Sequence, residues 1–288
     1  MPELPEVQAH AERLTADLAG APLEGFRALA FTALKTATPD PADAVGRPLE
    51  RVARRGKLLV LRFPDPAGAA LDADDCSFVV HLMQGGRLKP DEKQSAKPRG
   101  GQARWRFEDG RALLLTEAGT ERKAGVWVVA GDPDAAEPLA HLGPDADAIS
   151  LDELGAALGA TSMRVHGFLR DQRQLAGLGR RLANEVLHRA KLSPFASTAK
   201  LDADQVAALH GAIGACIDES LASERARDDM SSSKDRPGAV HHRTGEPCPV
   251  CGDQVREVAY NRYTVSYCPT CQTGGKVLAD NTTSKFLK

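Results

Sequence analysis

The spacing of hydrophobic residues changes twice along the chain. Between Val7 and Leu18 they recur every three or four residues, which predicts an amphipathic helix. From Gly25 to about Val129 short apolar runs are separated by Gly, Pro and Asp, a pattern typical of antiparallel strands. The runs are residues 26–31, 57–63, 77–82, 103–107, 112–115 and 126–129. These patterns predict an N-terminal antiparallel β-sandwich with a flanking helix over residues 1–131.

The helical spacing returns after residue 149. Ser150 is followed three residues later by Glu153, a capping-box spacing that predicts a helix to about residue 158. Further helices are expected over residues 204–210 and 211–221. Residues 132–149 are acidic and rich in Ala and Pro, which is typical of a linker. The chain is therefore predicted to be an α+β multidomain protein, with a helical domain over residues 150–238.

The overall charge is nearly balanced, so contact with nucleic acid requires local groups of basic residues. The 288 residues include 37 Lys and Arg against 39 Asp and Glu, a formal net charge of -2. Residues 164–191 contain seven Lys and Arg but only two acidic residues, and a smaller group consists of Arg51, Arg54, Arg55 and Lys57. Both groups of basic residues could bind the phosphate backbone of a nucleic acid. The alternative is that they are only a solvent-exposed surface.

Neither a membrane span nor a secretion signal is predicted. No apolar run approaches the roughly 18 residues that a bilayer-spanning helix needs. The first residues are acidic, whereas a signal peptide begins basic and then becomes apolar. We expect a cytoplasmic or nucleoid-associated protein with no membrane partner.

The N-terminus carries an unusual candidate nucleophile. Removal of Met1 would leave Pro2 with a free secondary amine. Free α-amino groups have a pKa of about 7.7 to 8.0. Such an amine attacking a sugar aldehyde carbon gives a cationic iminium, which promotes elimination of the attached phosphate. Glu3 and Glu6 could move protons beside it. The alternative is that the prolines stiffen a terminal arm and the glutamates favour a helix start.

Four of the six cysteines form two Cys-x-x-Cys pairs. The pairs are Cys248 with Cys251 and Cys268 with Cys271, and sixteen residues lie between them. This spacing matches a zinc ribbon with one structural Zn²⁺, because four thiolates leave no open position on the metal. A redox dithiol is the remote alternative. The isolated Cys76 and Cys216 are expected to be buried, reduced side chains.

A Gly-x-Gly turn precedes a predicted helix in the basic region. Gly177 and Gly179 would leave backbone N–H groups free to approach a phosphate at the start of that helix, where Arg180 follows. A Gly-x-Gly on its own more often marks a simple turn.

Three regions of the chain resemble the formamidopyrimidine-DNA glycosylase and endonuclease VIII family. They are the opening Met1-Pro2-Glu3-Leu4-Pro5-Glu6-Val7, residues 168–187 with their Gly-Leu-Gly turn, and the two cysteine pairs. The resemblance implies an N-terminal catalytic β-sandwich, a helix-two-turn-helix DNA-binding domain and a C-terminal zinc-ribbon β-hairpin. The zinc finger would cover residues 239–273, followed by a C-terminal extension over 274–288.

The resemblance also implies a bifunctional DNA glycosylase and AP lyase of base excision repair. Its partner would be damaged double-stranded DNA with the target nucleotide flipped out, bound by a monomer. Pro2 would attack the sugar C1′, the base would leave, and β/δ-elimination would cut the strand. Glu3 would act as acid and base, with Glu6 as a supporting carboxylate. Lys57 would clamp a phosphate beside the lesion, where otherwise an ordinary solvated hairpin lysine is expected.

The implied DNA contacts include departures from the family pattern. His81 and Gln84 lie in a loop similar to the one that fills the space left by the flipped nucleotide. Gln84 stands where formamidopyrimidine-type members have methionine, and it resembles the endonuclease VIII wedge; a turn glutamine without a role is the alternative. Arg122 occurs where an Arg-Phe wedge is expected, but no aromatic residue follows it.

Two further departures affect the phosphate contacts. Arg180 replaces the asparagine that typically follows the second glycine of the turn. The arginine of the family's zinc finger lies five residues before the third cysteine, where this chain has Tyr263, and Arg262 is one residue earlier. Arg262 is therefore the candidate for that contact.

Two alternative functions stay open at this stage. One is a family member with an altered substrate, such as AP sites, interstrand cross-links or lesions in single-stranded DNA. The other is a non-catalytic zinc-ribbon protein that binds damaged DNA, favoured if Met1 is retained. The choice between oxidised purines and oxidised pyrimidines is also open. Gln84 and the missing Arg-Phe pair favour pyrimidines or an atypical lesion.

Overall fold

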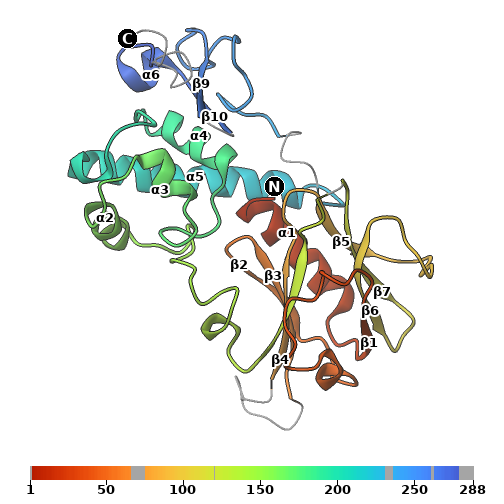
Figure 1. Ribbon diagram of the computed structural model, residues 1–288. Helices are drawn as coiled ribbons and strands as arrows, with labels where there is room; N and C mark the ends of the chain where they lie inside the picture. Colours follow the sequence, from red (N-terminus) through yellow and green to blue (C-terminus); the bar gives the residue numbers. More distant parts are fainter. Residues whose placement is uncertain (1, 66–74, 120, 231–235, 261–262, 279–288) are drawn as a thin grey trace. The chain divides into compact units, whose positions relative to one another are not determined.

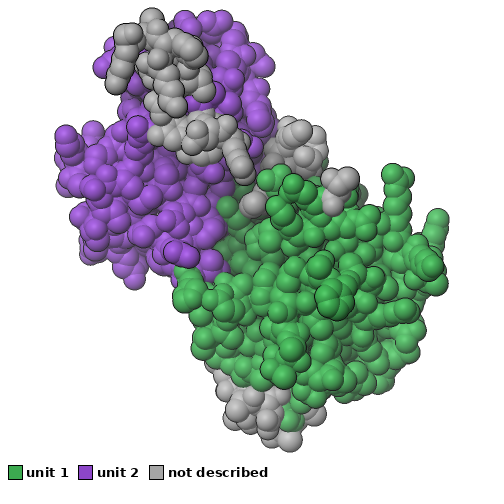
Figure 2. Space-filling model, viewed as in Figure 1, with its two compact units in different colours: residues 1–141, 224–231 green, residues 142–223, 232–288 purple. Residues whose placement is uncertain are grey.

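The computed structural model describes residues 2–65, 75–119, 121–230, 236–260 and 263–278 (Figure 1). They form two compact units (Figure 2). Unit 1 contains residues 1–141 and 224–231, and unit 2 contains residues 142–223 and 232–288. The α+β architecture expected from the sequence is confirmed: unit 1 is a β-sandwich and unit 2 is helical with a small β-hairpin.

Unit 1 is built from two four-stranded antiparallel sheets. One sheet has the order β1-β6-β7-β5 and the other the order β2-β3-β4-β8. The strands are β1 (Leu23–Ala28), β2 (Arg51–Arg55), β3 (Leu58–Phe63), β4 (Cys76–His81), β5 (Gly86–Pro90), β6 (Gly101–Phe107), β7 (Ala112–Glu117) and β8 (Gly125–Ala130). Short 3₁₀ turns lie at η1 (Pro41–Ala44) and η2 (Pro133–Ala135).

Aromatic rings from both sheets pack together in the core of unit 1. The ring centroid of Phe78 in β4 lies 5.8 Å from that of Trp105 in β6, and 5.6 Å from that of Phe63 in β3. The Phe26 ring of β1 approaches Trp105 to 5.0 Å. Helix α1 (Leu4–Leu18) adds its apolar face to this core through Val7, Ala11, Leu14 and Leu18. The helical spacing read from the sequence therefore marks the buried face of α1.

The hydrophobic pattern does not predict two of the strands, β2 and β5. Each is an edge strand of its sheet. Unlike the edge strand β8, these two strands carry several charged residues on their exposed sides, so their sequences lack a continuous apolar run. In β2, Arg51, Arg54 and Arg55 supply the polar residues, and only Val52 is buried. The basic group of Arg51, Arg54 and Arg55 therefore lies in a strand, and the loop that contains His81 and Gln84 ends where β5 begins at Gly86.

Unit 2 contains α2 (Leu151–Gly159), α3 (Val165–Arg170), α4 (Arg180–Arg189), η3 (Thr198–Lys200) and most of α5 (Ala203–Arg225). It also contains the hairpin of β9 (Arg256–Tyr260) and β10 (Tyr263–Tyr267), followed by α6 (Pro269–Thr273). The predicted capping box is confirmed, because Ser150 N–H donates to Glu153 Oε2 at 2.8 Å and Ser150 Oγ accepts from Glu153 N–H. Among the helices of the described residues, none has both the length and the hydrophobicity that a bilayer span requires.

Helix α5 is continuous where two helices were expected. A break was placed before Gly211, but the helix runs through Gly211 and Gly214 to Arg225. A glycine inside a helix costs only about 1 kcal/mol relative to alanine. Packing over the length of this 23-residue helix offsets that cost. Glu224 and Arg225, its last two residues, belong to unit 1.

A buried ion pair anchors the segment between β5 and β6. Arg104 Nε donates to Asp91 Oδ2 at 2.8 Å, and the two side chains are 7% and 8% exposed. We expect Asp91→Ala to lower the free energy of unfolding by roughly 3–5 kcal/mol, because it leaves a buried guanidinium without its counter-ion. Urea denaturation of the full chain measures the loss.

The exposed pair of Arg106 and Glu24 supplies a matched control. Arg106 Nη2 lies 3.2 Å from Glu24 Oε1, and the two side chains are 53% and 48% exposed. Glu24→Ala should change the free energy of unfolding by at most about 1 kcal/mol, because solvent screens the pair. Equal losses for Asp91→Ala and Glu24→Ala would contradict the assignment of Asp91 as an anchor.

Candidate active site and metal centre

Pro2 lies directly before the first helix of unit 1. Glu3 is the N-cap of α1, and its side chain accepts a hydrogen bond from the backbone N–H of Glu6. In return, Glu6 Oε2 accepts from the Glu3 N–H at 2.9 Å. Pro2 is buried, and Glu3 and Glu6 are 4% and 0% exposed. This reciprocal capping box fixes the backbone just behind Pro2 and keeps two carboxylates next to it.

Lys57 lies in the turn between β2 and β3. Arg55 pairs with Leu58, so Gly56 and Lys57 form a two-residue hairpin turn. Gly56 has a φ of 57°, a left-handed conformation that tight hairpin turns require and glycine adopts without strain. Lys57 is only 8% exposed. A cation held in a tight, largely buried turn is better ordered than the solvated lysine of the alternative interpretation.

Arg54 links the hairpin of Lys57 to the helix that follows Pro2. Its Nε donates to Gln8 Oε1 of α1 at 3.0 Å, and its Nη1 donates to the carbonyl of Gly56 at 3.3 Å. One guanidinium thus binds both α1 and the turn itself. The sequence indicated Arg54 only as a member of a basic group.

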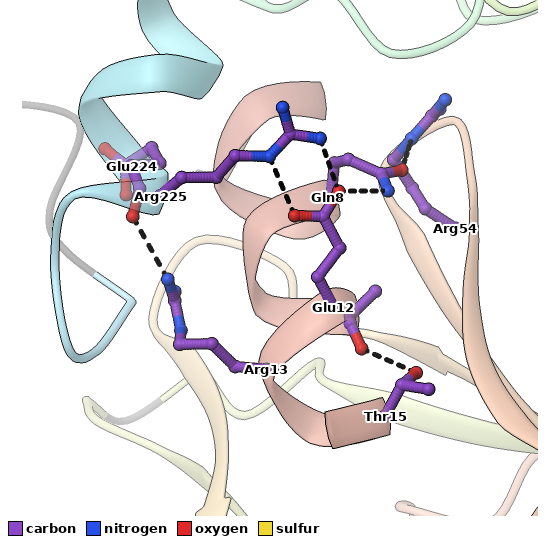
Figure 3. Close-up of polar contacts among 8 residues, drawn as sticks. Gln8, Glu12, Arg13, Thr15, Arg54, Glu224 and Arg225 are labelled. Atoms are coloured by element: carbon purple, nitrogen blue, oxygen red, sulfur yellow. Dashed lines mark hydrogen bonds and ion pairs between the residues drawn. The ribbon is translucent and has the colours of Figure 1, made fainter. Parts of the chain in front are cut away.

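The polar network continues along α1 to the end of α5 (Figure 3). Gln8 Nε2 donates to Glu12 Oε1 at 2.9 Å, and Arg225 binds both Glu12 oxygens at 2.7 and 2.8 Å. Hydrogen bonding from the Arg225 guanidinium lowers the pKa of Glu12. Arg13 Nη1 adds a bond to the carbonyl of Glu224 at 3.0 Å. Sequence reasoning missed this network, because only the i,i+4 spacing of Gln8 and Glu12 is visible in the sequence.

The loop after β4 presents Gln84 to solvent. His81 Nδ1 accepts from the Met83 N–H at 2.9 Å, and Met83 has a left-handed φ of 51°. The Gly86 N–H closes the turn on the carbonyl of Leu82, and a Cβ at Gly86 would lie only 2.1 Å from that oxygen. Leu82 is buried and Gln84 is exposed. Both ends of the loop are therefore fixed by hydrogen bonds, while Gln84 is exposed to solvent, as a residue that enters the duplex must be.

Burial keeps several histidines neutral, and this predicts a loss of stability in acid. Desolvation lowers the pKa of His10 and of His81 to about 4, with the charge of Lys57 adding to the effect at His81. Desolvation likewise lowers the pKa of His166 and of His241 to about 3. Histidines in the unfolded chain have a pKa of about 6.5. Between pH 6.5 and 4 the unfolded chain therefore binds more protons, so the free energy of unfolding falls as pH falls.

Chemical denaturation at pH 7, 6 and 5 tests this prediction. His10→Gln should make the pH dependence shallower, because it removes one buried group that cannot be protonated in the fold. His141→Gln is the control, because His141 is exposed. A free energy of unfolding that stays constant between pH 7 and 5 would contradict the prediction.

Arg122 lies in the segment that joins β7 to β8, and its side chain is exposed. Its neighbours Glu121 and Lys123 form an ion pair at 2.8 Å. The end of the segment is held by Glu117, whose Oε2 accepts from the Ala124 N–H at 2.6 Å. Arg122 is thus available for a contact outside the protein, and its role stays a prediction.

In unit 2, Gln172 holds together the turn that precedes α4. Its Nε2 donates to the carbonyl of Leu178 at 2.9 Å, and its Oε1 accepts from the Gly177 N–H at 3.0 Å. The Gly177 N–H is therefore already bonded, which differs from the expectation that it is free for a phosphate. Gly179 is the N-cap of α4, and the half-buried Arg180 is its first residue.

The four cysteines of the two pairs converge in unit 2. Cys251 Sγ lies 3.4 Å from Cys268 Sγ, and Cys248 Sγ lies 3.9 Å from Cys271 Sγ. The first pair sits in a turn where the Gly252 N–H donates to the Cys248 carbonyl, and the second pair lies at the start of α6. Arg262, the candidate for the phosphate contact of the zinc finger, lies outside the described residues.

The chemistry of these donors fits a bound dication. Burial raises the pKa of Cys268 to about 11 and also raises the pKa of Cys271. A backbone hydrogen bond instead lowers the pKa of Cys251. Two of the four thiols therefore resist losing their protons without a cation beside them, and a divalent metal supplies that charge. Four sulfur donors within about 4 Å of their neighbours suit tetrahedral Zn²⁺.

Comparison with known proteins decides the family. The model of the formamidopyrimidine-DNA glycosylase N-terminal domain matches residues 1–127, and that of the formamidopyrimidine-DNA glycosylase H2TH domain matches residues 141–231. The formamidopyrimidine-DNA glycosylase of Roseiflexus sp. (strain RS-1) is 30% identical over 285 residues, which cover 94% of this chain and 100% of that protein. The chain belongs to the formamidopyrimidine-DNA glycosylase family. The family resemblance noted in the sequence is confirmed, and the protein is a DNA repair glycosylase of this family.

Other members of the formamidopyrimidine-DNA glycosylase family extend the comparison. An uncharacterized formamidopyrimidine-DNA glycosylase-like protein of Mycobacterium tuberculosis is 43% identical over 162 residues, covering 56% of this chain and all of that protein. The crystal structure of MutM (Fpg) from Thermus thermophilus is 27% identical, with a TM-score of 0.76 over 96% of this chain and 100% of that one. MutM in complex with DNA containing carbocyclic 8-oxo-G shares the fold at 19% identity, with a TM-score of 0.79 over 94% of this chain and 100% of that one.

Proposed function

We propose that the chain is a bifunctional DNA glycosylase and AP lyase that excises damaged bases through its N-terminal proline. The observation that carries this proposal is the position of Pro2. It precedes a helix whose first turn is fixed by the Glu3 and Glu6 capping box, in a region where both carboxylates are buried. A nucleophile on a fixed backbone loses little entropy when it attacks, which is what covalent catalysis requires.

The reaction begins when the neutral Pro2 nitrogen attacks C1′ of a flipped nucleotide. The bond from C1′ to the base breaks, and the base leaves with a proton that Glu3 can supply. The attacking Pro2 nitrogen gives up its N–H proton, which Glu3 can pass to the ring oxygen, and the bond from C1′ to that oxygen breaks to leave a cationic iminium between Pro2 and the opened sugar. The iminium accepts electrons when a proton leaves C2′, so the 3′-phosphate departs by β-elimination. Loss of a second proton, from C4′ of the now conjugated iminium, expels the 5′-phosphate by δ-elimination. Water finally releases Pro2.

Lys57 serves as the phosphate clamp of this reaction. A phosphate beside the lesion carries negative charge that a largely buried ammonium can bind strongly. The bonds of Arg54 to Gln8 and Gly56 hold the turn of Lys57 against α1, the helix that Pro2 directly precedes. Glu6 supports the site by holding the Glu3 backbone.

The binding partner in this proposal is damaged double-stranded DNA. Solved relatives with the same fold were determined with damaged DNA, including a complex of the Lactococcus lactis Fpg with DNA that contains an abasic site. Gln84 would fill the space that the flipped nucleotide leaves, with His81 fixing its loop. Arg122 would contact the duplex nearby. Gly179, Arg180 and Arg262 would contact the phosphate backbone, while Gln172 holds Gly177 within the turn.

One Zn²⁺ is assigned to Cys248, Cys251, Cys268 and Cys271. When bound, the metal supplies folding free energy to the C-terminal module and takes no part in the chemistry on DNA. The module would then present the β9–β10 hairpin to the phosphate backbone.

The substrate is proposed to be an oxidised base. An altered substrate is the second candidate, and one observation favours it: Arg122 is exposed without an aromatic residue after it, so the wedge against the opposite strand is incomplete. AP sites, cross-links and lesions in single strands do not require that wedge.

A panel of end-labelled oligonucleotides tests the proposal. Duplexes should carry an oxidised purine, an oxidised pyrimidine, an AP site or no lesion, with matching single strands. We expect cleavage of at least one lesion-containing duplex with elimination products at the ends. Cleavage of AP sites or single strands alone supports the altered substrate. Binding without any cleavage would overturn the catalytic proposal in favour of a damage-binding protein.

A further inference from the structure

The cysteine cluster includes a fifth donor, His188 of α4. Its Nε2 lies 3.2 Å from Cys248 Sγ, and the residue is buried, with 4% exposure. The ligand atoms of His188, Cys248, Cys268 and Cys271 all lie within 4.8 Å of one another. An imidazole nitrogen is as ordinary a zinc ligand as a thiolate. Five donors therefore converge where a tetrahedral metal takes four.

Helix α4 holds His188 firmly against the metal module. His188 is buried in the last turn of α4, as are Val186 and Leu187. Just beyond the end of α4, the chain is tied to α6, because Gln272 Nε2 donates to the carbonyl of Leu192 at 2.9 Å. Gln272 also caps the second cysteine pair, since its Oε1 accepts from the Cys268 N–H at 2.8 Å. The imidazole is thus held near the sulfur atoms by the packing of both helices.

Cys251 is the donor that differs most from the rest. It is exposed, whereas Cys248 and Cys268 are buried and Cys271 is half-buried. It also lies outside the set of four ligand atoms that are mutually within 4.8 Å. Three cysteines are therefore common to both possible ligand sets, while exposed Cys251 and buried His188 compete for the fourth position.

We propose that His188 is the reserve fourth ligand of this metal centre. With all four thiolates bound, the neutral ring donates its Nε2 hydrogen to Cys248 Sγ and offsets part of the negative charge of the cluster. When Cys251 does not bind, the ring carries its proton on Nδ1 instead, and Nε2 binds the metal. No net proton is gained or lost by the ring. Cys251 is then the one cysteine that the centre can lose.

This inference rests on the zinc site of the proposed function but not on Pro2 chemistry. Its test uses the metal content of the full-length protein, purified from zinc-supplemented cells and dialysed against a weak chelator. The variants are Cys251→Ser, Cys268→Ser, His188→Gln and the double variant Cys251→Ser with His188→Gln. Cys268→Ser is the matched control, because it removes a ligand common to both sets.

We expect about one zinc per chain for the native protein, for Cys251→Ser and for His188→Gln. Cys268→Ser and the double variant should lose most of their metal. Cobalt substitution gives a second readout that does not depend on activity. The visible ligand-field bands of Cys251→Ser should move to shorter wavelength than those of the native protein, because a nitrogen ligand replaces a sulfur one. His188→Gln should leave the band positions of a four-sulfur site.

Three results would overturn the proposal. The first is that Cys251→Ser loses as much zinc as Cys268→Ser does, whether by weaker binding or by failure to fold. The second is that the double variant retains its zinc. The third is that the cobalt bands of Cys251→Ser do not shift. A native protein that holds no zinc refutes the metal assignment itself, which is a different failure. Loss of lyase activity with normal zinc content concerns Pro2 and leaves the inference intact.

Discussion

Pro2→Gly is expected to reduce strand cleavage at AP sites by roughly 10³-fold or more, the scale of losing a covalent nucleophile. Glycine also has a terminal amine, but its primary amine forms a neutral imine that must gain a proton before it can draw electrons. The substitution also frees the φ angle that proline fixes just before Glu3, the N-cap of α1. DNA affinity should change only a few-fold, because Pro2 acts on the sugar and not on the phosphates.

Single-turnover cleavage and equilibrium binding, measured on the same AP-site duplex, separate these two effects. Pro5→Ala is the matched control, because Pro5 is a buried proline in the first turn of α1 that has no terminal amine. It should retain cleavage within a few-fold. Pro2→Gly that cleaves as fast as the native protein would remove Pro2 from the mechanism.

Removal of the metal is expected to unfold the C-terminal module while unit 1 keeps its structure. Metal binding supplies about 10–16 kcal/mol to a small zinc module, more than its own core can replace. The hydrophobic core of the module consists of a few residues, namely Val240, Cys248, Val255 and Cys268 with Ala239 and Cys271 packed against them. Strong chelation should therefore abolish protection of β9, β10 and α6 from hydrogen exchange. Strands β3 and β4 of unit 1 should keep theirs.

Cys216→Ser provides the control for this experiment. Cys216 is buried in α5, and burial raises its pKa to about 12, so it is a protonated thiol without a role in metal binding. This variant should keep its metal and its protected amides. Chelation that leaves β9, β10 and α6 protected would show that the module folds without metal.

The parts of the fold that the sequence predicts are those with a local signal. The apolar face of α1, the capping box of Ser150 and Glu153, and the central strands each depend on residues close together in the chain. The edge strands β2 and β5 give a weak signal, because their exposed sides carry polar residues. The continuity of α5 through Gly211 depends on packing along its whole length, which a local pattern does not contain.

The candidate site divides in the same way. Pro2, Glu3 and the paired cysteines were found because their chemistry and spacing are unusual in a short stretch of sequence. The bond between Glu12 and Arg225 joins residues 213 positions apart, and His188 lies 60 positions from Cys248. Nothing local distinguishes Arg225 or His188 from other helix residues. Long-range partners of this kind become visible only once the chain is folded.

Catalysis through Pro2 requires a covalent iminium between Pro2 and DNA. Sodium borohydride trapping of the native protein on a duplex with an AP site, followed by peptide mass mapping, tests it most directly. We expect a trapped complex in which the DNA remnant is attached to the N-terminal peptide at Pro2, with Met1 absent. DNA binding without any trapped complex, or a remnant attached to a lysine such as Lys57, would contradict it.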